Sequence, residues 1–116
     1  MKNLKNILYK VAVKEVYGNT DIDINNIQFD SRQVQDNDVF VAQKGVTVDG
    51  HQYIEKAVSL GAKAVICEEV PEERSEQVAY IKVEDSNVAL AITIKKEHVN
   101  LSFEPKSVYL IILVSV

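Results

Sequence analysis

The chain has 116 residues, the length of one ordinary domain, and 47% of them are hydrophobic while 26% are charged. This balance is typical of a globular protein and excludes collagen, a coiled coil or a wholly disordered chain. The net charge of −4 disfavours binding to the phosphates of a nucleic acid, so no nucleic acid partner is expected.

The single cysteine, Cys67, has no second cysteine with which to form an internal disulfide, which favours a reducing compartment. No stretch of the chain approaches the roughly 18 consecutive apolar residues of a membrane span. Segment 1–10 is unlike a signal peptide because lysines interrupt its apolar residues. We therefore expect a cytoplasmic, monomeric protein that has no membrane span.

Three elements are expected in the first part of the chain. Apolar residues recur at helical spacing near the N-terminus, which predicts a short helix at 3–8. Alternating apolar and polar residues predict one half-buried strand over 22–29, with a shift in its ladder at Asn25-Asn26. A turn then precedes a short buried strand at 39–42.

The middle of the chain has the pattern of a crossover between parallel strands. A loop with a glycine at each end, residues 45–50, precedes a helical pattern at 52–60 that stops at Gly61. The continuous apolar run 64–67 predicts a strand inside a sheet that is covered on both faces.

A further strand is expected at 78–83, followed by a helix at 86–92 for which Asp85 offers an N-cap oxygen. The order of these elements predicts an α/β fold: a small single domain with a mixed β-sheet and flanking helices. Beyond Ile92 the residues are β-branched and charged, which suits a helix poorly, and 108–114 is a strongly apolar run.

The chain offers few residues for catalysis. His51 and His98 have no partner at metal-ligand spacing, and Cys67 lies in an apolar strand where we expect it to be inert packing. No glycine-rich loop ends in Lys-Ser or Lys-Thr, so no means of binding ATP is visible. We predict no catalytic residue and no metal ligand in this chain.

Two loops are better candidates for binding. Residues 29–32, Phe-Asp-Ser-Arg, follow a strand end, which is where open α/β sheets usually place ligands. The loop 45–51 is flanked by glycines, so its backbone could meet the edge of a flat ring. The plain alternatives are an Asp-initiated turn with a surface arginine, and an ordinary connection between a strand and a helix.

Taken in order, several short motifs resemble the N-terminal domain of the Mur ligases, and in particular the MurE type, UDP-N-acetylmuramoyl-L-alanyl-D-glutamate ligase. The resemblance covers residues 1–91, with the looser MurF type as a sibling alternative. Its main motifs are Phe29-Asp30-Ser31-Arg32, Val39-Phe40-Val41-Ala42, Asp49-Gly50-His51, Ala64-Val65-Ile66-Cys67-Glu68-Glu69 and Tyr80-Ile81-Lys82-Val83 running into Asp85-Ser86-Asn87.

The resemblance implies that this domain holds the uridine diphosphate end of a UDP-N-acetylmuramoyl-peptide, for the ligase that makes the UDP-linked tripeptide of peptidoglycan. In that family ATP and magnesium bind to other domains, so no cofactor is expected here. By the same resemblance, Asp30 and Arg32 shape the turn, with Arg32 a candidate diphosphate donor. The substrate-binding positions that the resemblance implies are Phe29, Ser31, Val46, Thr47 and Val48.

The chain departs from the family after Ala91, where the family continues toward a phosphate loop. We therefore expect a binding domain at 1–91 and a tail at 92–116 that comes from a truncated or frame-shifted gene, so that the chain alone is catalytically incompetent. Two alternatives stay open. One is a deliberate stand-alone domain, and the other is a non-catalytic module that binds a protein partner through 108–114.

Overall fold

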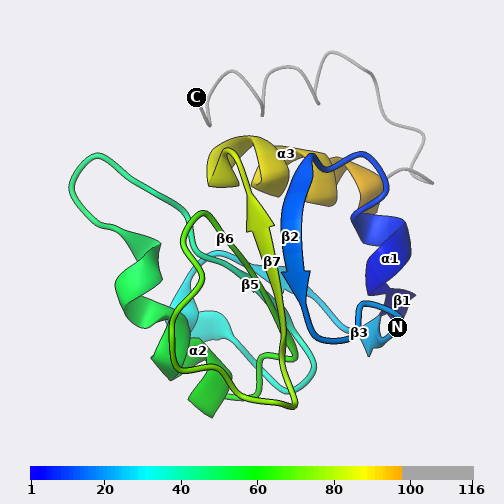
Figure 1. The fold of residues 1–116 in the computed structure, drawn as a ribbon, viewed down its shortest axis with the longest axis horizontal. Helices are drawn as coiled ribbons and strands as arrows, with labels where there is room; N and C mark the ends of the chain where they lie inside the picture. The colour runs from blue at the N-terminus through cyan, green and yellow to red at the C-terminus, as the bar shows by residue number, and fades with distance from the viewer. Residues whose placement is uncertain (98–116) are drawn as a thin grey trace.

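The computed structural model of the protein describes residues 1–97. Its centre is a five-stranded mixed sheet in which four neighbouring strands run parallel. The edge strand β2 runs antiparallel to β7 (Figure 1). This architecture confirms the predicted α/β fold. In spatial order the strands are β2 (Val13–Tyr17), β7 (Ala79–Val83), β6 (Ala64–Cys67), β5 (Val39–Val41) and β4 (Ile27–Gln28).

The helices are short except for the last one. A separate two-stranded sheet also joins the N-terminus to the segment before β4. The remaining elements are β1 (Lys2–Asn3), α1 (Leu4–Ile7), β3 (Asp23–Ile24), the 3-10 turns η1 (Ser31–Gln33) and η2 (Gly50–Tyr53), α2 (Ile54–Ser59) and α3 (Ser86–Glu97).

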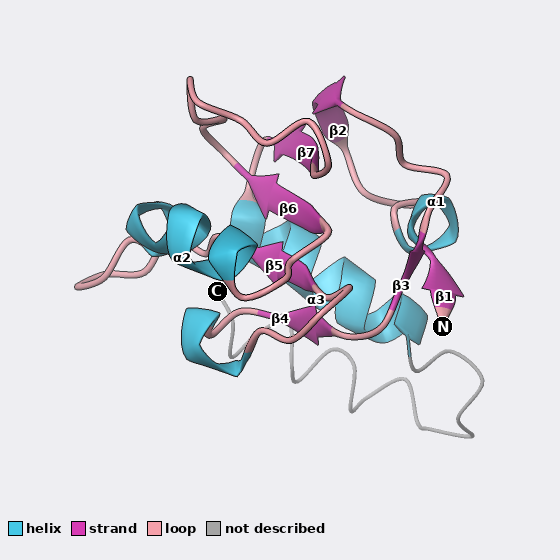
Figure 2. Ribbon diagram, turned by 90° about the horizontal axis from the view of Figure 1, so that it is seen from below, coloured by secondary structure: helices cyan, strands magenta, loops and turns pink. Residues whose placement is uncertain are grey.

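Strand residues alternate between two apolar layers, as the period of two in a strand requires. On one face Val41 and Ile66 pack with residues of α1 and α3, and on the other face Phe40 and Val65 pack with Ile54 and its neighbours on α2. Figure 2 shows α2 on one side of the row of parallel strands and α3 on the other. Every residue of β5 and β6 is buried, as the apolar runs predicted.

The crossover from β5 through α2 to β6 is confirmed. Gly61 ends its helix with φ of 112°, a conformation that favours glycine. Cys67 is fully buried in β6, and this burial raises the pKa of its thiol to about 12. The cysteine is therefore inert packing, as expected from its apolar surroundings.

The structure differs from the sequence prediction in two places before residue 30. The expected single strand over 22–29 is two short strands in different sheets, because β3 pairs with β1 and β4 pairs with β5. The edge strand β2 was not predicted at all. Four of its five residues are exposed, so it lacks the alternation that reveals a half-buried strand.

The last described helix is longer than the predicted 86–92 and continues to Glu97. Ile92 and Ile94 pack against the core, and Thr93 is fully buried with its hydroxyl donating to the Leu90 carbonyl at 2.9 Å. Tertiary packing therefore overrides the weak helix propensity of this segment. Residues 98–116, with His98, the apolar run 108–114 and most of the expected tail, lie outside the described residues.

The carboxyl ends of the parallel strands lie at one edge of the sheet. The segments that leave this edge are residues 29–32 after β4, 43–50 after β5, 68–69 after β6 and the start of α3 after β7. Both loops that were predicted to bind a ligand are among them. None of the helices in the described part of the chain is long and apolar enough to cross a membrane.

Candidate functional site

A cavity of about 470 Å³ lies beyond the carboxyl ends of β4 and β5. Its walls come from three segments: the turn after β4, the loop after β5, and the start of α2. The lining residues are Phe29, Asp30, Ser31, Arg32, Phe40, Gln43, Gly45, Val48, Gly50, Tyr53 and Lys56. The two loops singled out in the sequence therefore meet across one hollow.

Three of the five predicted binding residues line this cavity, and two do not. Phe29, Ser31 and Val48 contribute to its walls, and the supporting residues Asp30 and Arg32 do so as well. Val46 and Thr47 form the exposed tip of the loop and are not among the lining residues.

The turn after β4 is shaped by Asp30. Its carboxylate accepts a hydrogen bond from the Arg32 backbone N–H at 2.9 Å and caps the 3-10 turn η1. The Arg32 side chain also folds back onto it, with Nε donating to Oδ1 at 3.0 Å and Nη2 donating to Oδ2 at 2.8 Å. These bonds lower the pKa of the Asp30 carboxyl to about 2. Asp30 therefore caps the turn, and the Arg32 side chain is held against it.

Ser31 adds a polar group to the cavity wall at this turn. The residue is 7% exposed and lines the cavity. Within the described residues its hydroxyl forms no hydrogen bond, whereas the neighbouring Asp30 and Arg32 satisfy each other. A hydroxyl that is partly enclosed and unpartnered can donate or accept one hydrogen bond from a bound molecule.

The loop after β5 is a tight excursion that returns to the sheet edge. An isolated antiparallel β-bridge pairs Lys44, where the loop leaves the sheet, with Asp49, where it returns. The Gly45 N–H donates a hydrogen bond to the Val48 carbonyl at 2.9 Å. The Gly50 N–H closes the base by donating to the Gln43 carbonyl at 2.8 Å. A Cβ on Gly50 would lie 2.8 Å from the Gln43 nitrogen, so close backbone approach requires glycine there.

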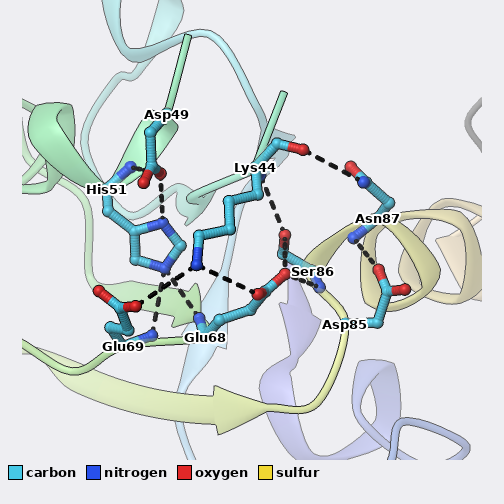
Figure 3. Close-up of polar contacts among 8 residues, drawn as sticks. All are labelled: Lys44, Asp49, His51, Glu68, Glu69, Asp85, Ser86 and Asn87. Atoms are coloured by element: carbon cyan, nitrogen blue, oxygen red, sulfur yellow. Dashed lines mark hydrogen bonds and ion pairs between the residues drawn. The ribbon is translucent and has the colours of Figure 1, made fainter. Parts of the chain in front are cut away.

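The loop is anchored to the end of β6 by His51. The imidazole Nε2 accepts hydrogen bonds from the backbone N–H groups of Glu68 at 2.9 Å and Glu69 at 3.2 Å. The tautomer that fits carries its proton on Nδ1, which donates to Asp49 Oδ1 at 2.7 Å. Hydrogen bonds from the His51 backbone N–H and ring lower the pKa of Asp49. Figure 3 shows this imidazole between the loop and the strand end.

A second anchor joins the same loop to the start of α3 (Figure 3). Glu68 Oε2 accepts hydrogen bonds from the Ser86 N–H at 2.9 Å and the Ser86 hydroxyl at 2.8 Å. That hydroxyl in turn accepts from the Lys44 N–H at 3.2 Å, and the Asn87 side-chain amide donates to the Lys44 carbonyl at 3.3 Å. The base of the loop is therefore fixed from two directions.

The sequence analysis missed several residues that build the site. His51 had no partner at metal-ligand spacing, so its structural role as an anchor was not found, although the Asp49-Gly50-His51 spacing fits a capped turn. Tyr53 and Lys56 were treated as parts of a helix, yet both line the cavity. Their separation of three residues places both on one helix face, but this spacing does not show that the face meets the turn after β4.

Among the residues that the structure describes, no three His, Cys, Asp or Glu side chains gather in a way that could hold a metal ion. The clustered carboxylates of Glu68 and Glu69 face the Lys44 ammonium instead, at 3.8 Å and 3.4 Å.

Comparison with known proteins gives a consistent result. The family model described as "Mur ligase family, catalytic domain" matches residues 23–98, a range that includes all of α3. The UDP-N-acetylmuramoyl-L-alanyl-D-glutamate–2,6-diaminopimelate ligase of Bacteroides fragilis is 46% identical over 87 residues, which are 75% of this chain and 18% of that protein. The enzyme of the same name from Clostridium tetani is 41% identical over 91 residues, 77% of this chain and 19% of that protein.

Solved structures of MurF ligases have a similar fold. The MurF ligase of Thermotoga maritima, solved in complex with ADP, matches 67% of this chain and 18% of its own length with a TM-score of 0.57 and 35% identity. A MurF structure from Acinetobacter baumannii matches 70% of this chain and 17% of its own length with a TM-score of 0.60 and 27% identity. The chain spans about a fifth of the length of these relatives.

The anchor at Glu68 predicts a difference between two neighbouring glutamates. Glu68→Ala removes the acceptor of two hydrogen bonds to fully buried Ser86, so we expect it to lower the free energy of unfolding by about 2–3 kcal/mol. Glu69→Ala removes only an exposed ion pair and should change it by about 0.5 kcal/mol or less. Urea denaturation measures both, and equal losses in the two variants would contradict the anchor.

The Asp30–Arg32 pair predicts how this carboxyl titrates. Because its pKa lies at about 2 in the folded chain, below the ordinary 3.8, the pair stabilises the fold above pH of about 4, and that contribution is lost as the pH falls toward 2. Carbon-detected NMR of the Asp30 carboxyl should show this low midpoint, and Arg32→Gln should return it toward the ordinary value. A midpoint near the ordinary value in the unaltered chain would show that the pair does not form.

Proposed function

The chain belongs to the Mur ligase family, and we propose that it is the domain of a peptidoglycan-precursor ligase that binds the uridine diphosphate end of a UDP-N-acetylmuramoyl-peptide. The observation that carries this proposal is the shared cavity, which brings Phe29 and Ser31 from one loop against Val48 from another. The names of the sequence relatives, which contain UDP-N-acetylmuramoyl-L-alanyl-D-glutamate, supply the class of ligand.

The walls of the cavity suit a flat ring. Phe29 is 56% exposed and Tyr53 is 39% exposed, so two aromatic faces are open to solvent at a site that also contains half-exposed Val48. Covering such side chains with a pyrimidine removes apolar surface from water, and aromatic rings pair favourably with other flat rings.

Val46 and Thr47 take a different place in this proposal. They project from the tip of the loop after β5, where Val46 is completely exposed. We assign them to the part of the substrate that extends out of the cavity, for which the Thr47 hydroxyl and the loop backbone offer hydrogen bonds. This assignment differs from the base-contacting role that the family resemblance implies for them.

The MurE type is favoured over the MurF type by sequence. Identity reaches 46% and 41% with the two diaminopimelate ligases, against 35% and 27% with the two MurF structures. The sequence contains no glycine-rich phosphate loop, so we assign substrate binding to this chain and do not assign phosphoryl activation to it.

Ser31→Ala tests the proposal. Removal of one hydrogen bond of about 1 kcal/mol should weaken UDP binding about fivefold, as measured by isothermal titration calorimetry or by an NMR titration. Ser59→Ala is the matched control, because that exposed hydroxyl donates to the Lys56 carbonyl and does not line the cavity.

Thermal denaturation of both variants separates loss of binding from loss of fold, since Ser31 is buried. The proposal fails if the unaltered chain does not bind UDP, and the role of Ser31 fails if its alanine variant binds as tightly as the control.

A further inference from the structure

The charged side chains that line the cavity are not all paired with a group of opposite charge. Three charged side chains line it: Asp30, Arg32 and Lys56. Asp30 and Arg32 neutralise each other through two side-chain hydrogen bonds in a forked geometry. Within the described part of the chain, no carboxylate lies at ion-pair distance from the Lys56 ammonium. The cavity therefore carries one uncompensated positive charge, and Lys56 supplies it.

The rotation of α2 directs this side chain. Ile54 is 5% exposed and Ala57 is fully buried, so these two residues fix the apolar side of the helix against the sheet. Tyr53 and Lys56, three residues apart, lie together on another side and line the cavity. Lys56 lines the same cavity as Asp30 and Ser31, which places it across from the turn after β4.

The contacts of the Arg32 side chain argue against it as the hydrogen-bond donor to the phosphates. Its Nε and Nη2 groups already donate to Asp30, and releasing them would leave that carboxylate facing an anionic ligand. Lys56 has no such bond to break. A lysine ammonium is a compact charge on a flexible stem and can follow a phosphate group without a fixed approach geometry.

We propose that Lys56 binds the diphosphate of the nucleotide, and that Arg32 holds Asp30 in place instead. This inference rests on the proposed function, because it assigns a residue to the charged half of the same ligand. Ser31, whose hydroxyl has no hydrogen-bond partner within the described residues, lines the same cavity and could offer the phosphates one further hydrogen bond. The exposed aromatic rings are left to hold the base.

Comparison of UDP with uridine tests the assignment. Lys56→Gln should weaken UDP binding about fivefold or more while leaving uridine binding unchanged, because uridine has no phosphate. Lys56→Arg, which keeps the charge, should restore most of the UDP affinity. Lys10→Gln, an exposed lysine outside the cavity, is the matched control for the change in net charge.

The outcomes separate this inference from the proposed function. If Lys56→Gln and Lys10→Gln bind UDP equally well, Lys56 is not the phosphate contact, although the domain still binds the nucleotide. If the unaltered chain binds neither UDP nor uridine, the proposed function fails. In that case a titration with pyrophosphate still tests whether Lys56 binds a diphosphate. Shifts of the Lys56 side-chain resonances would support the inference, and unmoved resonances would overturn it.

Discussion

The loop between β5 and α2 crosses the end of the sheet, and one β-bridge joins its two halves. The position of this loop against the sheet depends on the His51 imidazole. Replacing that ring would leave two backbone N–H groups at the end of β6 without their acceptor, at a cost of about 1–3 kcal/mol for each group that is not rehydrated. Glu68 holds the other side of the loop through Ser86. Because Val48 belongs to this loop, both anchors determine one wall of the cavity.

Much of the fold could be predicted because the central strands are buried on both faces. Apolar runs revealed β5 and β6, and Gly61 marked the end of α2 correctly. The edge strand β2 could not be recognised, since its pairing with β7 comes from backbone hydrogen bonds that leave its side chains mostly exposed. The end of α3 was misplaced because tertiary packing, which a local pattern does not contain, buries Thr93.

The candidate site could be predicted where local turn chemistry defines it. The Asp30 cap and the strand-end position located one wall, and the glycine-flanked loop located the other. The sequence did not reveal that Arg32 is occupied by Asp30, nor that Lys56 faces the same hollow from a helix more than twenty residues away. Such long-range proximity depends on the register between β4 and β5, and local spacing does not encode it.

The most direct test of this account is NMR chemical-shift mapping of the whole chain with UDP. The account predicts that the perturbed resonances belong to residues 29–32, Val48, Tyr53 and Lys56, with the interior of β6 unchanged. A second hollow, of about 390 Å³, lies where α2 meets the 71–75 loop and provides the comparison. Shifts confined to that hollow, or no shifts at all, would contradict the claim that the two strand-end loops form a nucleotide site.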